Sequence, residues 1–327
     1  MTARERFLKT LNFEKPDDRL PMIEWAAWWN LTADRWKNEG FEQAYDFVES
    51  QKYFDLDPMF CIGASPRSSQ FPNLGDITDE ASYDKIRPFL FQDEGINALL
   101  EGVKALKEQH DKGEIIIRVW LDGFFWFPRT LFGIEGHLYA FYDYPELMHR
   151  INNDLAEFNI KVINALCKVI TPDMFGFAED MSYNHGPMIS YNIFKEFLLP
   201  YYTRVIPHIN KYGVKVFIDS DGDITQMVPW FMEAGIEGVY PLERQAGVDI
   251  NFIREKYPKF LMLGAYDKMV MKHGESAMRA EFERILPVMR SGGYIPSIDH
   301  QTPPDVSLEN YKIYARLFKE YAEKALY

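Results

Sequence analysis

The chain has 327 residues, of which 47% are hydrophobic and 16% aromatic, which is enough for one large core and too apolar for a disordered chain. Its formal net charge is −13, from 49 acidic and 36 basic residues. No lysine and arginine cluster stands out that could neutralise a phosphate backbone, so nucleic acid is excluded as an expected partner. The two cysteines, Cys61 and Cys167, form no CxxC pair and indicate neither a disulfide framework nor a thiolate metal site.

The N-terminal segment has an amphipathic helical pattern that stops at a proline, without the apolar centre of a signal peptide. No run approaches the roughly 18 uninterrupted apolar residues that a membrane span needs. We therefore expect a soluble, cytoplasmic protein that makes no contact with a membrane.

Short apolar runs alternate with amphipathic segments along the chain, and no low-complexity linker or internal repeat divides it. The apolar runs predict strands at residues 20–24, 53–60, 115–121, 174–178, 214–218, 238–240, 260–263 and 293–296. Helical spacing predicts helices at residues 95–109, 145–170, 190–212, 225–234, 275–291 and 308–326. The stretch 60–79, with its prolines and serines, is expected to form an ordered loop over the edge of the sheet.

Eight such strand and helix units predict an α/β fold, a single-domain (β/α)₈ (TIM) barrel over residues 1–327 with an N-terminal helical extension. Continuously apolar strands are typical of a parallel sheet that is buried on both faces. A doubly wound nucleotide-binding sheet is the alternative, and it should carry a glycine-rich turn after its first strand. Here the first strand runs into Trp25-Ala-Ala-Trp28-Trp29, and neither GxGxxG nor a P-loop is present.

Polar residues follow the predicted strands, where barrel enzymes place their functional groups. After strand five, Asp219 and Asp221 alternate along an extended segment, so their side chains can share one face. Glu243 follows strand six and His300 follows strand eight, at the same rim. Carboxylates with one imidazole can bind zinc or a harder divalent ion, with a position left open for substrate or water. Such a cation would act as a Lewis acid on an ether or hydroxyl oxygen.

Each of these residues also has a simpler interpretation. The segment Asp219-Ser-Asp221-Gly-Asp is typical of a turn and helix N-cap as well. His300 can be a structural hydrogen-bonding residue, and Glu243 can pair with Arg244. The metal site is favoured because all four residues follow strands on one side of one barrel.

The same rim is rich in aromatic side chains, which can line a pocket for an aromatic or methyl-bearing ligand, or else plug the barrel mouth or form a subunit contact. Glu179 and Asp180 follow strand four, and adjacent carboxylates raise each other's pKa, so we expect them to be the catalytic pair, with Asp180 alternatively orienting the substrate. The residues expected to bind substrate are Trp25, Trp28, Phe125, Trp126, Asn184 and Tyr266.

Several segments resemble the uroporphyrinogen decarboxylase-like superfamily: RERFLKTLNFEKPDDRLP at the start, FAEDMSYNHGPMIS and FKEFLLPYY in the middle, and KVFIDSDGDITQMVPWFMEAGIEGVYPLERQAGVDI and GGYIPSIDHQTPPDVSLENYKIY towards the end. The resemblance covers nearly the whole chain and implies the (β/α)₈ barrel. Uroporphyrinogen decarboxylase proper carries a glycine- and arginine-rich loop after its first strand, which grips the carboxylates of its substrate. This chain has Trp25-Ala-Ala-Trp28-Trp29 there, and its RQAG segment follows strand six, so porphyrinogen decarboxylation is not expected.

The chain is more similar to the cobamide-dependent methyltransferases, whose zinc ligands are His-x-Cys after strand five and Cys after strand eight. The matching positions are Asp219, Asp221 and His300, so every ligand differs from that pattern. An oxygen-rich set suits a thiol acceptor poorly. The resemblance then implies a methyltransferase that demethylates a small O-methyl or N-methyl compound, with zinc as the metal, and passes the methyl group to a corrinoid carried by a partner protein.

Two other functions stay open at this stage. One is a metal-free decarboxylase or lyase that uses Asp219, Asp221 or His300 for proton transfer. The other is a ligand-binding relative without catalysis. The methyl donor, the metal and the oligomeric state are not determined by the sequence.

Overall fold

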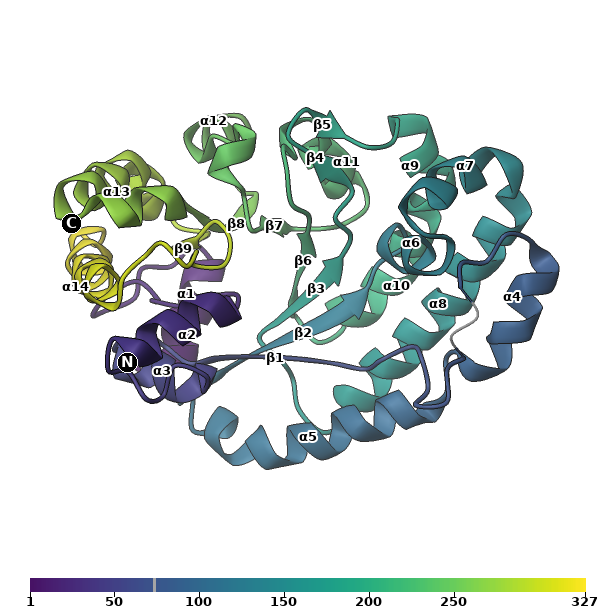
Figure 1. The fold of residues 1–327 in the computed structure, drawn as a ribbon, viewed down its shortest axis with the longest axis horizontal. Coiled ribbons are helices and arrows are strands. Elements are labelled where there is room, and N and C mark those ends of the chain that lie inside the picture. Colours follow the sequence, from purple (N-terminus) through teal and green to yellow (C-terminus); the bar gives the residue numbers. More distant parts are fainter. Residues whose placement is uncertain (73–74) are drawn as a thin grey trace.

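The structure, a computed structural model, describes residues 1–72 and 75–327 and contains a parallel sheet that curls around its own inner face (Figure 1). The strands lie in the order β1-β2-β3-β6-β7-β8-β9, and each pair of neighbours is parallel. A short antiparallel hairpin, β4 and β5, follows β3. The strand bounds are β1 Met59–Gly63, β2 Ile116–Asp122, β3 Met174–Ala178, β4 Ser182–Tyr183, β5 Gly186–Pro187, β6 Lys215–Asp219, β7 Gly238–Tyr240, β8 Leu261–Tyr266 and β9 Tyr294–Ile298.

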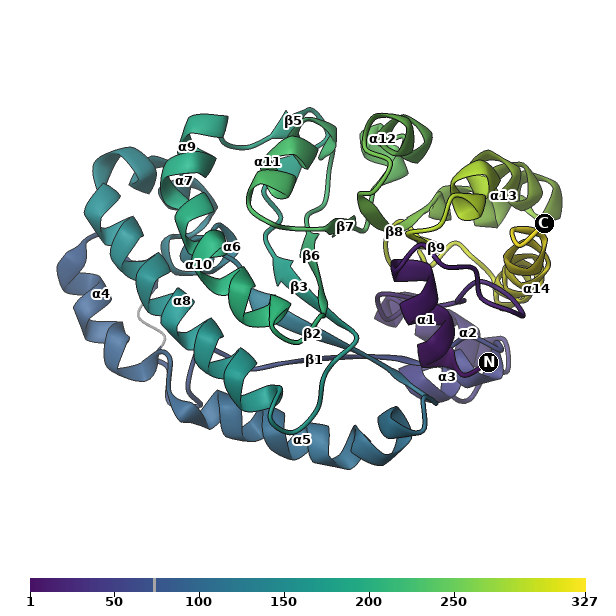
Figure 2. The ribbon, with the colours of Figure 1, turned by 180° about the vertical axis from the view of Figure 1, so that it is seen from behind.

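Helices connect the strands and pack on the outer face of the sheet, as Figure 2 shows for α5, α8 and α10. Their apolar faces are buried, and α8 alone buries eleven residues between the sheet and its neighbouring helices. The α-helices are α1 Ala3–Leu11, α2 Asn30–Asn38, α3 Phe47–Tyr53, α4 Glu80–Ile86, α5 Asp93–Asp111, α6 Trp126–Phe132, α7 Ile134–Asp143, α8 Pro145–Leu166, α9 Tyr191–Phe197, α10 Leu199–Asn210, α11 Val228–Glu233, α12 Ile250–Lys256, α13 Glu275–Arg290 and α14 Leu308–Lys324. Four 3₁₀ turns, Arg87–Phe89, Thr225–Met227, Arg244–Ala246 and Lys268–His273, complete the described elements.

The inner face of the sheet encloses a second, smaller core. Alternate residues of the strands point inward, and the inner apolar layer includes Met59, Ile116, Met174 and Phe217. Helix α1 closes the N-terminal end of this layer with Phe7 and other apolar side chains. The apolar end of the interior is therefore filled, and the carboxyl ends of the strands are left for polar groups.

The predicted first strand, residues 20–24, is not a strand, so the sheet has seven strands and β9 does not pair with β1. The segment nevertheless lies between these two strands. Asp57 N donates to Met22 O at 2.6 Å, and Trp25 N donates to Ser297 Oγ at 3.4 Å. Pro21 removes one backbone donor, and the Asp57 carboxylate accepts from Met22 N at 2.9 Å in place of a strand carbonyl. Side-chain hydrogen bonds thus replace the ladder that a closed barrel would have here.

Other predicted boundaries shift for local reasons. The run 53–60 does not form one strand, because Asp55 adopts a positive φ of 58° and β1 begins only at Met59. The helix expected at 190–212 is divided into α9 and α10 at Leu198, whose φ of −117° departs from the usual helical value two residues before Pro200. The stretch 60–79, expected as a loop, begins within β1, and its residues 73–74 lie outside the described residues. The strands at 174–178 and 238–240 are confirmed as predicted.

Within the described ranges, none of the helices combines the length and the apolar character that crossing a membrane requires.

Candidate functional site

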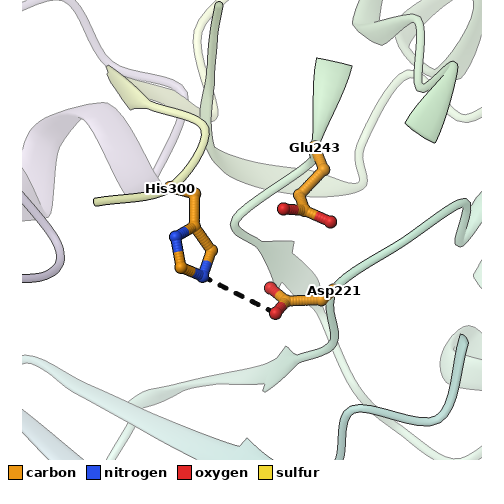
Figure 3. Close-up of side chains that lie close together, drawn as sticks. All are labelled: Asp221, Glu243 and His300. Atoms are coloured by element: carbon orange, nitrogen blue, oxygen red, sulfur yellow. Dashed lines mark ion pairs between the residues drawn. The ribbon is translucent and has the colours of Figure 1, made fainter. Parts of the chain in front are cut away.

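Three of the four predicted metal ligands converge at the carboxyl ends of the strands. Asp221 follows β6, Glu243 follows β7, and His300 follows β9. One ligand atom from each of the three residues lies within 4.8 Å of those of the other two. Figure 3 shows the three side chains pointing toward one another, and His300 Nε2 is 3.6 Å from Asp221 Oδ2. All three are partly exposed, so a ligand can reach them.

Asp219 belongs to a second, overlapping group. Its carboxylate lies with those of Asp180 and Asp221, again within 4.8 Å of one another. Asp219 is the last residue of β6 and points into the sheet's inner face, where it is only 6% exposed. The four predicted ligands are therefore divided between two groups that share Asp221, and Asp180 is the additional carboxylate.

Burial and like charge perturb this second group. Burial, and after it the neighbouring Asp221 carboxylate, raise the pKa of Asp180 to about 6, against smaller opposing effects that include Arg129. Burial also raises the pKa of Asp219 well above its ordinary value, although the Arg118 guanidinium opposes the change. The pKa of the His300 imidazole is raised by the facing Asp221 carboxylate, against the effect of burial. With a pKa of about 6, Asp180 can hold or move a proton near neutral pH.

The backbone around the site is strained where it places these side chains. Asp180 and Leu242 adopt positive φ values of 42° and 66°, which are uncommon for non-glycine residues. Gly222 has a φ of 82°, and a Cβ there would lie 2.6 Å from the backbone of Tyr183. Its N–H donates to Glu243 Oε2 at 2.9 Å, which fixes that carboxylate beside Asp221. The Asp-Gly-Asp turn thus both presents Asp221 and orients Glu243.

Glu179, predicted as one of the catalytic pair, is fully buried and faces away from this group. Its carboxylate accepts hydrogen bonds from the backbone N–H groups of Phe124 and Phe125 at 2.7 Å and of Trp126 at 2.9 Å, as well as from the Tyr202 hydroxyl. These donors occupy both oxygens of the Glu179 carboxylate, which lies at the N-terminus of α6. Burial raises the pKa of Glu179 to about 7, against the hydrogen bonds that lower it. The arrangement supports an anchoring role for Glu179 and leaves Asp180 as the accessible member of the pair.

Two of the predicted substrate-binding aromatic residues lie near the site. The Trp25 ring is 5.9 Å from the His300 ring in an edge-on arrangement, and its Nε1 donates to Ile298 O at 3.0 Å. Trp126 is half-buried and packs on the Arg129 guanidinium, whose Nη1 donates to Asp180 O at 3.0 Å.

The structure does not bring the other four together with the acidic groups. Trp28 packs among Trp36 and other rings beneath the N-terminal helices. Phe125 is buried against the α7 helix, and Tyr266 is buried against α13 and α14. Asn184 is exposed in the turn between β4 and β5, next to the strand whose backbone faces Gly222.

One charged residue near the site was not predicted from the sequence. Arg118 interrupts the apolar strand β2 and is only 4% exposed, on the inner face below Asp219. An arginine within an otherwise apolar strand was the available signal, because a buried charge needs a partner.

Comparisons with known proteins agree with the resemblance seen in the sequence. The family model described as uroporphyrinogen decarboxylase (URO-D) matches residues 63–321. A methyltransferase from Methanosarcina mazei has a similar structure, with a TM-score of 0.60 and 14% identity over 98% of this chain and 99% of that one. A maltogenic α-amylase, AmyB, from Thermotoga neapolitana is less similar, with a TM-score of 0.41 and 10% identity over 91% of this chain and 74% of its own. No curated protein matches the sequence.

Proposed function

The chain belongs to the uroporphyrinogen decarboxylase family, and on that premise we propose that it is a metal-dependent methyltransferase that moves a methyl group from a small O-methyl or N-methyl compound to a corrinoid protein. The observation that carries the proposal is the convergence of Asp221, Glu243 and His300 at the carboxyl ends of three strands. Methyl transfer is the activity named for the similar structure from Methanosarcina mazei, and we extend it to this chain as part of the proposal.

The three side chains fit a divalent cation of the zinc type. Two carboxylates and one imidazole are a donor set that zinc accepts, with a fourth position left for a substrate or water. In a tetrahedral site with bonds of about 2.0–2.1 Å, two ligand atoms are roughly 3.4 Å apart. The separation of 3.6 Å between His300 Nε2 and Asp221 Oδ2 is close to this value and too long for a good hydrogen bond. When bound, zinc would polarise the heteroatom that carries the methyl group and make it a better leaving group.

The surrounding residues have separate roles in the proposal. Asp180, whose pKa is raised to about 6, can hold a proton next to the leaving heteroatom or accept a hydrogen bond from it. Trp25 gives the site an apolar wall beside His300, and Trp126 adds an aromatic surface near Asp180. Asp219 lies deeper, next to Asp221, where burial favours its protonated form.

The corrinoid is assigned to a partner protein. A methyl group transfers in line to the acceptor atom, so the partner has to approach the open carboxyl ends of the strands. We propose that the corrinoid-binding protein docks over this rim, where Asp221, Glu243 and His300 are partly exposed.

Metal content tests the proposal directly. Protein purified without chelator should contain about one equivalent of zinc, measured by elemental analysis, and His300→Ala should lose it because three ligands become two. His273→Ala is the matched control, since His273 is exposed and lies outside both acidic groups. A wild type that is metal-free and cannot be reloaded with zinc would refute the metal-dependent function.

A metal-free decarboxylase or lyase is the second candidate, and the raised pKa of Asp180, about 6, favours it, since such a carboxyl can transfer a proton near neutral pH. This candidate predicts that turnover survives treatment with a chelator. A binding protein without catalysis predicts ligand binding with no turnover in the presence of any corrinoid partner.

A further inference from the structure

The interior of the curled sheet contains a buried arginine with two guanidinium nitrogens that have no hydrogen-bond partner among the described residues. Arg118 is 4% exposed, and these two nitrogens are its Nε and Nη1. Its Cζ lies 4.9 Å from the centre of the Tyr240 ring and 5.8 Å from that of Trp25. Aromatic faces attract a guanidinium but leave its N–H groups without acceptors. Leaving a charged donor buried and unpaired is costly, so the arrangement calls for an anion.

A second polar group points to the same place. The Tyr240 hydroxyl is also buried without a hydrogen-bond partner in the described part of the chain. It lies above Gly176, where a Cβ would be 2.4 Å from it, so the glycine leaves room for the hydroxyl inside the sheet. Asp219 attracts Arg118 electrostatically but makes no hydrogen bond with either unused nitrogen. Two unpartnered donors from β2 and β7 thus lie together below the acidic groups.

The position is reachable from the open end of the sheet. Cys61 pairs in register with Arg118, points to the same inner face and is exposed. Trp25 connects the two ends of the site, since its ring lies 5.8 Å from the Arg118 guanidinium and 5.9 Å from the His300 ring. One small molecule along this indole can therefore contact both Arg118 and the Asp221–Glu243–His300 group.

We propose that Arg118 and Tyr240 form an anion-binding subsite that holds the carboxylate of a small substrate, while the opposite, methyl-bearing end of that substrate reaches Asp221, Glu243 and His300. The guanidinium fork matches a planar carboxylate through two parallel hydrogen bonds. A phosphate dianion fits less well, because it carries a second negative charge that one guanidinium does not balance. The identity of the methyl-bearing end rests on the proposed function, whereas the carboxylate subsite itself needs no metal.

Calorimetric titration of chelator-treated protein tests the subsite apart from the metal. The probes are benzoate, its uncharged isostere benzamide, and inorganic phosphate. Wild type should bind benzoate at least about tenfold more tightly than benzamide, as expected for a charged hydrogen bond. Arg118→Met should abolish this preference, and Tyr240→Phe, which removes only an unpartnered hydroxyl, should weaken benzoate binding about threefold. Arg316→Met is the control, since Arg316 is exposed on α14.

Equal affinities for benzoate and benzamide, no binding of either, or phosphate binding as tight as that of benzoate would each overturn the proposal. So would an Arg118→Met protein that keeps the preference. If this variant does not fold, unchanged benzoate affinity in Tyr240→Phe overturns it instead. A clear preference for benzoate in a protein that never binds zinc would leave the subsite standing and refute the metal-dependent methyltransferase. Zinc binding in a protein that shows no preference for benzoate would refute the subsite and leave the metal-dependent methyltransferase standing.

Discussion

Replacing Glu179 by glutamine should destabilise the protein far more than the same replacement at Glu24, although both carboxyls are 0% exposed and burial raises the pKa of both to about 7. The two differ in their donors. Glu24 accepts from the hydroxyls of Ser297 at 3.0 Å and Tyr311 at 2.9 Å. Glu179 accepts from three backbone N–H groups and one hydroxyl. A hydroxyl can rotate to accept a hydrogen bond from an amide, whereas a backbone N–H can only donate.

The magnitude follows from where the new amide nitrogen goes in Glu179→Gln. In the position of Oε2 it would face the N–H groups of Phe125 and Trp126, and in that of Oε1 the N–H group of Phe124 and the Tyr202 hydroxyl. In either orientation at least one buried N–H loses its acceptor, at about 1–3 kcal/mol. The hydrogen bonds that remain lose their charge, at about 1 kcal/mol each. Both replacements also remove a buried charge, which offsets part of the loss by a similar amount in each. At pH 8 the free energy of unfolding should therefore be lower in Glu179→Gln than in Glu24→Gln by about 3–5 kcal/mol.

Urea unfolding of the wild type and both variants measures their free energies of unfolding near pH 8, where a carboxyl with a pKa of about 7 is mostly ionised. Equal losses in the two variants would show that burial of the charge, and not the type of donor, decides the stability. A Glu179→Gln protein that is as stable as Glu24→Gln but has lost methyl transfer would contradict the anchoring role and support the catalytic role that the sequence suggested for Glu179.

Two further predictions concern the site turn and the pH dependence. Gly222→Ala should weaken zinc binding at least about tenfold, because the new Cβ collides with the backbone of β4 and displaces the N–H that holds Glu243. Gly213 also has a positive φ, but a Cβ there would have nothing within 4 Å. Gly213→Ala should therefore leave the zinc affinity unchanged in the same titration. Burial raises the pKa of Glu24 and Glu179 from 4.5 to about 7, so the stability linked to their protonation is complete below about pH 4.5 and is lost as the pH rises through 7. The wild-type free energy of unfolding should accordingly fall between about pH 5 and 8, and the fall should be smaller by up to about 3 kcal/mol in Glu24→Gln; an identical pH profile for the two proteins would refute the linkage.

The sequence predicts most of the sheet, because buried parallel strands are short apolar runs that local composition can identify. It misplaces the chain between Leu20 and Met59, where structure depends on long-range contacts. The run at 20–24 is apolar enough for a strand, but Pro21 and the Asp57 carboxylate replace ladder hydrogen bonds with side-chain ones. No local pattern shows that Asp57 will meet Met22 across 35 positions.

The candidate site follows the same division. The positions of Asp221, Glu243 and His300 come from the rule that carboxyl ends of parallel strands meet at one edge, so they could be predicted together. The direction in which a side chain points after a strand could not be predicted. Glu179 and Asp180 are adjacent in sequence, yet one carboxylate turns to the N-terminus of α6 and the other to the acidic group, because Asp180 has a positive φ.

The proposed cation and anion positions together determine how a substrate with both groups would lie. A carboxylate is itself a good zinc ligand, so a substrate that carried one would otherwise place it on the metal and turn its methyl group away. Arg118 offers the carboxylate a charged partner beside Trp25 and outside the group of metal ligands. The methyl-bearing heteroatom is then the group left to meet Asp221, Glu243 and His300. On this argument Arg118→Met should not merely weaken a carboxylate substrate but convert it into an inhibitor that competes for the metal, which a steady-state inhibition pattern with and without added zinc would detect.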